Sequence, residues 1–175
     1  MNALLESLLD KNEVERSDLE EKLYRTLILG VFTSLCKEIE KNDTKSTDKV
    51  TFMKFTDKGT AAENIIRNHH IDCKFTDDEY QLIGTYLMAF FKKSTRDKKF
   101  YDVYNREELL KKQECKCAVC KTTINLSTAE LDHIVPYKYV GDELENNAQL
   151  LCKTCNTRKG KSISFELAML LLNQT

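Results

Sequence analysis

Residues 117–120 read CAVC, and residues 152–155 repeat the same spacing as CKTC. Each Cys-x-x-Cys pair can present two thiolates to one ion, and four thiolates give the tetrahedral coordination of structural zinc. A redox motif or chance explains one such pair more easily than two. We therefore expect structural zinc in the last third of the chain. Its ligands are Cys117, Cys120, Cys152 and Cys155.

The chain has seven cysteines in all. Cys115 is an alternative ligand in place of Cys117, although the two-residue spacing favours Cys117 with Cys120. Cys36 and Cys73 lie in apolar stretches and are expected to be buried core thiols. A disulfide framework is not expected in a reducing compartment.

The composition is that of a soluble, helix-rich protein. Of 175 residues, 41% are hydrophobic and 31% are charged, with five glycines and one proline. No apolar run approaches the roughly 20 residues that a membrane span needs. The first residues also lack the basic start and the cleavage pattern of a signal peptide. We therefore expect a cytoplasmic protein that does not contact a membrane.

Charge is distributed unevenly along the chain. Residues 1–91 carry 12 basic and 17 acidic residues, whereas residues 92–161 carry 15 basic and 10 acidic ones. A polyanion such as DNA would be attracted to the second part and repelled by the first. We expect residues 1–91 to form a helical region that contacts a second copy or another protein. Residues 92–112 are expected to be a basic linker or strap, and residues 113–175 a separate module.

Helical periodicity dominates the first half of the chain. Two capping boxes, Ser17 with Glu20 and Thr76 with Glu79, mark the starts of two long helices. The long helices are expected over residues 16–42 and 75–94. Between them we expect a polar loop over 42–49, a short strand or extended piece over 50–55, and a short helix over 60–70.

The last third combines strands with helices. Its β-branched and apolar residues over 121–136 predict a hairpin, and residues 148–162 place the second cysteine pair ahead of a helix. A last helix over 162–174 is apolar nearly all round and must be buried against this chain or a partner. So small a module needs zinc because it cannot bury enough apolar surface alone. The predicted fold class is mainly α, with a small zinc-stabilised α+β module.

Asp132 and His133 are neighbours at the end of an expected strand. Successive strand residues point to opposite faces, so both can serve one site only where the strand ends. Asn156, at the start of the expected helix, can join them. Oxygen ligands from Asp132 and Asn156 suit Mg²⁺ or Mn²⁺, and a histidine can take a proton from water at neutral pH. His69 and His70 have no ligand partner at suitable spacing, so we expect both at the surface.

Basic residues follow Asn156 in the sequence. A helix start presents backbone N–H groups that favour phosphate, and Arg158, Lys159 and Lys161 add positive charge there. These three residues are expected to contact nucleic acid. Together with the carboxylate, the histidine and the asparagine, they predict hydrolysis of a phosphodiester with one metal ion.

The motif order CAVC, LDHIVP and NNAQLLCKTCNTRKGK resembles that of HNH endonucleases with four-cysteine zinc and the ββα-metal fold. The resemblance covers roughly residues 106–163. It implies that His133 is the general base and that Asp132 and Asn156 bind the catalytic cation. It also implies that Asn147 braces the loop between the strands and orients the histidine. Asn156 stands where many members have histidine, and this weaker ligand favours Mg²⁺ or Mn²⁺.

Other functions fit parts of the sequence. A zinc ribbon that binds nucleic acid without catalysis needs the cysteines and the basic residues, but not Asp132, His133, Asn147 or Asn156. A nuclease that cuts RNA would use the same groups as one that cuts DNA. The nuclease could also be a subunit of a bacterial defence, restriction or mobile-element system, and the sequence leaves these alternatives open.

Overall fold

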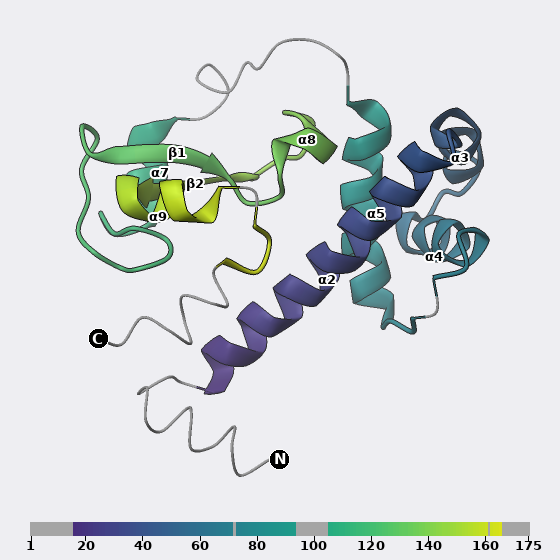
Figure 1. Ribbon diagram of the computed structural model, residues 1–175, viewed down its shortest axis with the longest axis horizontal. Coiled ribbons are helices and arrows are strands. Elements are labelled where there is room, and N and C mark those ends of the chain that lie inside the picture. The colour runs from purple at the N-terminus through teal and green to yellow at the C-terminus, as the bar shows by residue number, and fades with distance from the viewer. Residues whose placement is uncertain (1–15, 72, 94–104, 161, 166–175) are drawn as a thin grey trace. The chain divides into compact units, whose positions relative to one another are not determined.

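The structure is a computed structural model, and it divides the chain into two compact units (Figure 1). The helical unit comprises residues 28–100 and 135–147, and the strand-containing unit comprises residues 1–27, 101–134 and 148–175. Most of the expected basic linker and of the last apolar helix lies outside the described residues. The described ranges are 16–71, 73–93, 105–160 and 162–165.

Helices with buried apolar faces make up the helical unit, as the periodicity predicts. They are α2 (Arg16–Lys41), which belongs to this unit from residue 28 onward, α3 (Lys45–Phe52), α4 (Lys58–Asn68), α5 (Asp77–Lys92) and α8 (Tyr137–Val140). Buried side chains include Phe32, Leu35, Cys36, Phe52, Ile65, Leu87 and Phe90, whereas Cys73 is only partly buried. Among the described residues, no helix is both long and apolar enough to cross a membrane.

The prediction of a short strand or extended piece over residues 50–55 is wrong. These residues continue α3 as far as Phe52 and then form a turn, and the expected loop over 42–49 is helical from Lys45. Phe52 is buried and Val50 is exposed, so the two residues do not share one face as they would in a strand. The helical context therefore overrides the local β propensity.

One expected capping box is confirmed and the other is not. Thr76 and Glu79 form a complete capping box at the start of α5, in which the Thr76 backbone N–H donates to Glu79 Oε2 at 2.6 Å. Ser17 is not the N-cap of α2, because the helix already includes Arg16.

His69 is largely buried, although it was expected at the surface. Its Nε2 atom lies 2.8 Å from Asp48 Oδ2, and the Thr44 hydroxyl donates to the same oxygen at 2.5 Å. This contact links the end of α4 to α3. His70 is exposed, as expected.

The strand-containing unit has a ββα arrangement. In it, β1 (Ala129–His133) pairs antiparallel with β2 (Ala148–Cys152), and α9 (Lys153–Lys159) follows β2 directly. A further helix, α7 (Arg106–Lys112), packs against β2. The predicted fold class, mainly α with a small α+β module, is confirmed.

The prediction of a hairpin within residues 121–136 is wrong, because the strand found there, β1, pairs with β2 instead. The residues just before β1 form a turn. In this turn, Oδ1 of Asn125 accepts from the backbone N–H groups of Ser127 at 2.9 Å and Thr128 at 3.0 Å. Such an Asx turn occupies the polar stretch that would have supplied the other strand of the hairpin.

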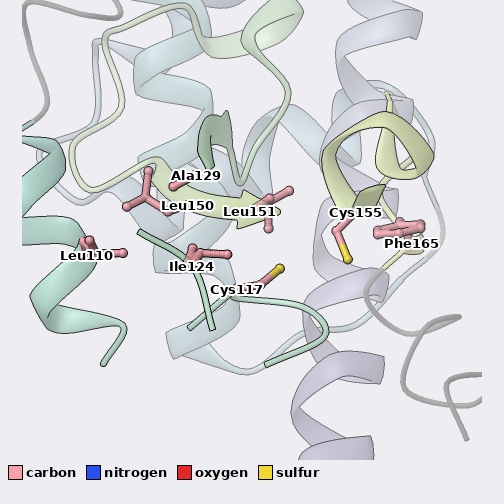
Figure 2. Packing of buried hydrophobic residues seen from close by; sticks show 8 residues of the cluster. All are labelled: Leu110, Cys117, Ile124, Ala129, Leu150, Leu151, Cys155 and Phe165. Atoms are coloured by element: carbon pink, nitrogen blue, oxygen red, sulfur yellow. The ribbon is translucent and has the colours of Figure 1, made fainter. Parts of the chain in front are cut away.

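A hydrophobic cluster forms the core of the strand-containing unit (Figure 2). Two of its members, Cys117 and Cys155, also belong to the Cys-x-x-Cys pairs, so the metal motif is part of this core. The buried members are Leu110, Cys117, Ile124, Ala129, Leu150, Leu151, Cys155 and Phe165.

Candidate functional site

Asp132 is held by two neighbours through one carboxylate oxygen. The strand register places it opposite Gln149, whose Nε2 donates to Asp132 Oδ2 at 2.9 Å. The Lys159 ammonium, from the end of α9, donates to the same oxygen at 2.6 Å. Within the described part of the chain, no hydrogen bond reaches Oδ1 of Asp132. The carboxylate is therefore anchored at one oxygen and can offer the other to a ligand.

Asn156 is oriented by a carboxylate on β1. Its Nδ2 donates to Glu130 Oε2 at 2.6 Å. An ionised carboxylate can only accept, so this contact decides which end of the amide faces Glu130. The amide oxygen of Asn156 is left for another ligand. Because Glu130 and Asp132 are two residues apart on β1, they lie on the same face of the strand.

The oxygen atoms left over at this face fit a hard divalent cation. One is Oδ1 of Asp132, and the other is the amide oxygen of Asn156. Mg²⁺ is commonly held by one or two carboxylates, while water and substrate phosphates complete its coordination shell. Few protein ligands are therefore needed, and the donor set present here is of the right chemical type.

His133 is the last residue of β1 and is buried. Its backbone oxygen accepts from Lys159 Nζ at 2.6 Å. His133 still pairs with Ala148 in the strand ladder, so its side chain starts from the face opposite to that of Asp132, and their use at one site stays a prediction. The same lysine thus contacts both residues of the Asp-His pair.

Asn147 braces the chain just after β1. It is buried, its Oδ1 accepts from the Val135 backbone N–H at 2.7 Å, and its Nδ2 donates to the Val135 carbonyl at 3.0 Å. One side-chain amide thereby satisfies both backbone groups of a residue two positions after His133. This contact is consistent with the expected brace, and an effect on the histidine stays a prediction.

The four motif cysteines lie together. Their Sγ atoms are all within 4.8 Å of one another, and the sulfurs of Cys120 and Cys152 are 3.8 Å apart. Four thiolates at about 2.3 Å from one zinc ion would be separated by about 3.8 Å. Cys115 is exposed and lies outside this group, which contains Cys117 instead. The cysteine cluster could therefore hold zinc.

Burial and hydrogen bonding shift the thiol pKa values in opposite directions. Burial raises the pKa of Cys152 and of Cys155, and contacts with the neighbouring cysteines raise that of Cys155 further. Burial acts against ionisation of Cys120 too, but hydrogen bonds from Thr122 help lower its pKa to about 6. Four thiolates are hard to accommodate together without a cation, and Zn²⁺ would supply the positive charge that lets all of them ionise.

The three residues expected to contact nucleic acid differ in accessibility. Arg158 is exposed and can reach a phosphate. Lys159 is 7% exposed, and its ammonium is bonded inside the unit to Asp132 and to the His133 carbonyl. Lys161 lies outside the described residues.

Sequence reasoning misses Glu130 and Gln149. The signal for Glu130 is the two-residue period of a strand, which places it on the same face as Asp132. Gln149 has no such local signal, because its contact with Asp132 depends on which strand pairs with β1.

This part of the chain is similar to known endonucleases. A CRISPR-associated endonuclease Cas9 of Corynebacterium diphtheriae is 36% identical over 58 residues, which are 33% of this chain and 5% of that relative. The chain therefore spans only a small part of that relative's length. No solved structure matches the chain. The family model for HNH endonucleases matches residues 117–162, and these residues are an HNH endonuclease domain.

Proposed function

We propose that this domain hydrolyses phosphodiester bonds in DNA, with one Mg²⁺ or Mn²⁺ ion and with His133 as the general base. The observation that carries the proposal is the placement of Asp132 and Asn156. Each is held by neighbours through one polar atom, and its other oxygen makes no hydrogen bond within the described residues. A zinc ribbon that only binds nucleic acid needs the cysteine cluster but not this arrangement.

In the proposed reaction, His133 takes a proton from water. The water oxygen forms a bond to phosphorus as the bond from phosphorus to the leaving oxygen breaks, and that oxygen takes up a proton from solvent. A cation held by Asp132 and Asn156 would supply positive charge beside the phosphate and the leaving oxygen. The cysteine cluster would hold Zn²⁺ in a structural role, because four protein ligands leave no open position.

Arg158 and Lys161 are proposed to contact the nucleic-acid backbone near the cleaved bond, where positive charge favours phosphate. The likeness to a CRISPR-associated endonuclease supports a role for the chain as the nuclease of a bacterial defence or restriction system. Such a role would place it in the cytoplasm, as the composition suggests.

Side-by-side assays on DNA and RNA of one sequence test the substrate. The full chain is incubated with each polymer, in single- and double-stranded form, with Mg²⁺ or Mn²⁺. Cleavage of DNA is expected. Cleavage of RNA alone would make the domain an RNA nuclease. If the chain binds nucleic acid but cleaves none of these substrates with either cation, the zinc ribbon is favoured.

The acidic region 1–91 is proposed to bind a second copy of the chain or another protein. Its excess of acidic residues gives it no electrostatic attraction to DNA. Within α2, Leu23 and Leu27 are 44% and 59% exposed, and residues four apart lie on one side of a helix. An exposed apolar strip of this kind is suited to contact with protein.

Replacing both Leu23 and Leu27 with glutamate is expected to abolish self-association in light scattering, or the co-purification of a partner. Zinc content should not change. Leu126→Glu is the control, because Leu126 is also exposed but lies outside this region. If the full chain is monomeric, captures no genomic neighbour and binds DNA more weakly after the double replacement, the region contacts DNA and this proposal fails.

A further inference from the structure

We propose that Lys159 is a positioning residue for the reaction and not a contact to nucleic acid. This inference rests on the proposed function, because it concerns the residues named there as cation ligand and general base. Lys159 is the last residue of α9, and its partners are the last two residues of β1. It therefore joins the helix end to the strand end at the proposed site.

The contacts of Lys159 account for its burial. Lysine is almost never fully buried unless it is paired. Its Nζ atom lies 2.6 Å from Asp132 Oδ2 and 2.6 Å from the His133 carbonyl oxygen. The Lys159 and Asp132 side chains are 8% and 13% exposed. An ammonium group has three donors, and two of them are used on the Asp-His pair.

These contacts restrain the groups that the reaction needs. Lys159 and Gln149 both donate to Oδ2 of Asp132, so rotation of the carboxylate would break two hydrogen bonds at once. The direction of Oδ1 is thereby restrained. The bond to the carbonyl of His133 restrains the main chain that carries the proposed base. Metal sites depend on supporting hydrogen bonds that hold the ligands of the ion in place.

The alternative role for Lys159 is a phosphate contact, which its place in the sequence suggested. To reach a bound phosphate, the ammonium would have to leave both Asp132 and the His133 carbonyl. Asp132 would then remain as a largely buried carboxylate without its ion pair, which is strongly unfavourable. Arg158, the preceding residue, is exposed and needs no such rearrangement.

The two roles predict different results for Lys159→Met, which keeps the length of the side chain but removes the charge. As a positioning residue, Lys159 should affect turnover: kcat should fall about 10- to 100-fold, the usual effect of removing a supporting contact at a metal site. The KM for DNA should stay within about twofold of wild type, by the same reasoning that separates turnover from binding.

Binding is measured separately, in a His133→Ala background in which DNA should remain uncut. There, Lys159→Met should leave both the DNA affinity and its dependence on salt unchanged. Arg158→Ala is the comparison, and it should weaken DNA binding and reduce the salt slope by about one, as expected for a lost phosphate contact. Zinc content and circular dichroism show whether each variant is folded.

A double-mutant cycle tests whether Lys159 acts through Asp132. In an Asp132→Asn background, Lys159→Met should lower kcat by much less than it does in wild type, because the residue being positioned is already impaired. If Lys159→Met does not fold, Lys159→Gln replaces it, since glutamine keeps an N–H donor for Asp132. Lys159→Gln should also reduce kcat without changing DNA affinity.

A loss of DNA affinity and of salt slope in Lys159→Met or Lys159→Gln, matching that of Arg158→Ala, would overturn the inference. So would a wild-type kcat in either folded variant while wild-type protein cleaves DNA. A wild-type protein that cleaves no nucleic acid refutes the proposed function instead. In that case the binding comparison still decides whether Lys159 contacts phosphate.

Discussion

Replacing His133 with alanine is expected to slow phosphodiester cleavage at least about 10²-fold, because a general base typically contributes 10²- to 10⁴-fold. The hydrogen bond from Lys159 to residue 133 should survive, since it goes to the backbone oxygen. Zinc content should also survive, because the histidine is not part of the cysteine cluster. Single-turnover cleavage at saturating DNA and Mg²⁺ measures the loss.

His70→Asn is the matched control for this experiment. His70 is exposed and has a φ of 53°, a left-handed conformation that asparagine tolerates. This variant is expected to cleave at the wild-type rate. A His133→Ala protein that keeps its zinc and also cleaves at the wild-type rate would show that another group acts as the base.

Cys152→Ser is expected to lose zinc and to unfold the strand-containing unit. Cys152 ends β2 and caps α9, where its sulfur accepts from the Cys155 backbone N–H at 3.4 Å. Zinc binding in small metal-dependent domains is worth on the order of 10 kcal/mol, which becomes folding free energy. Metal analysis should find about one zinc per wild-type chain and little in the variant. Limited proteolysis should show the loss of structure.

Cys115→Ser is the control for the metal experiment. Cys115 is exposed and lies outside the cysteine cluster, so this variant should keep its zinc and its resistance to protease. If Cys115→Ser loses zinc while Cys117→Ser retains it, Cys115 is the true ligand. Well-folded wild-type protein without zinc would contradict the metal assignment altogether.

The cysteine cluster could be predicted from the sequence, because two ligands of one zinc ion need a short, fixed spacing along the chain. Two thiolates of one Cys-x-x-Cys pair can reach one ion, and the structure brings Cys117, Cys120, Cys152 and Cys155 together. A similar argument placed Asp132 and His133 at the end of a strand, and β1 does end at His133. Such features need only a few neighbouring residues to be recognised.

The features that sequence reasoning missed depend on contacts between distant segments. The partner of β1 is β2, which follows it after residues 134–147, and no local pattern specifies that pairing. Without the pairing, Gln149 cannot be placed beside Asp132. The burial of Lys159 was missed for the same reason. A lysine in a basic stretch is normally solvated, and its burial becomes evident only when the end of α9 lies against the end of β1.

The most direct test of cation-dependent cleavage uses zinc-loaded, full-length protein in single-turnover assays, with and without added Mg²⁺. Wild type and Asp132→Ala are compared, and zinc content is checked in both. Wild type is expected to cleave DNA only when Mg²⁺ is added. Asp132→Ala should be at least about 10²-fold slower while retaining zinc, as expected when a catalytic metal ligand is lost. Full-rate cleavage by wild type without added cation, or by Asp132→Ala with it, would contradict cation-dependent cleavage at Asp132.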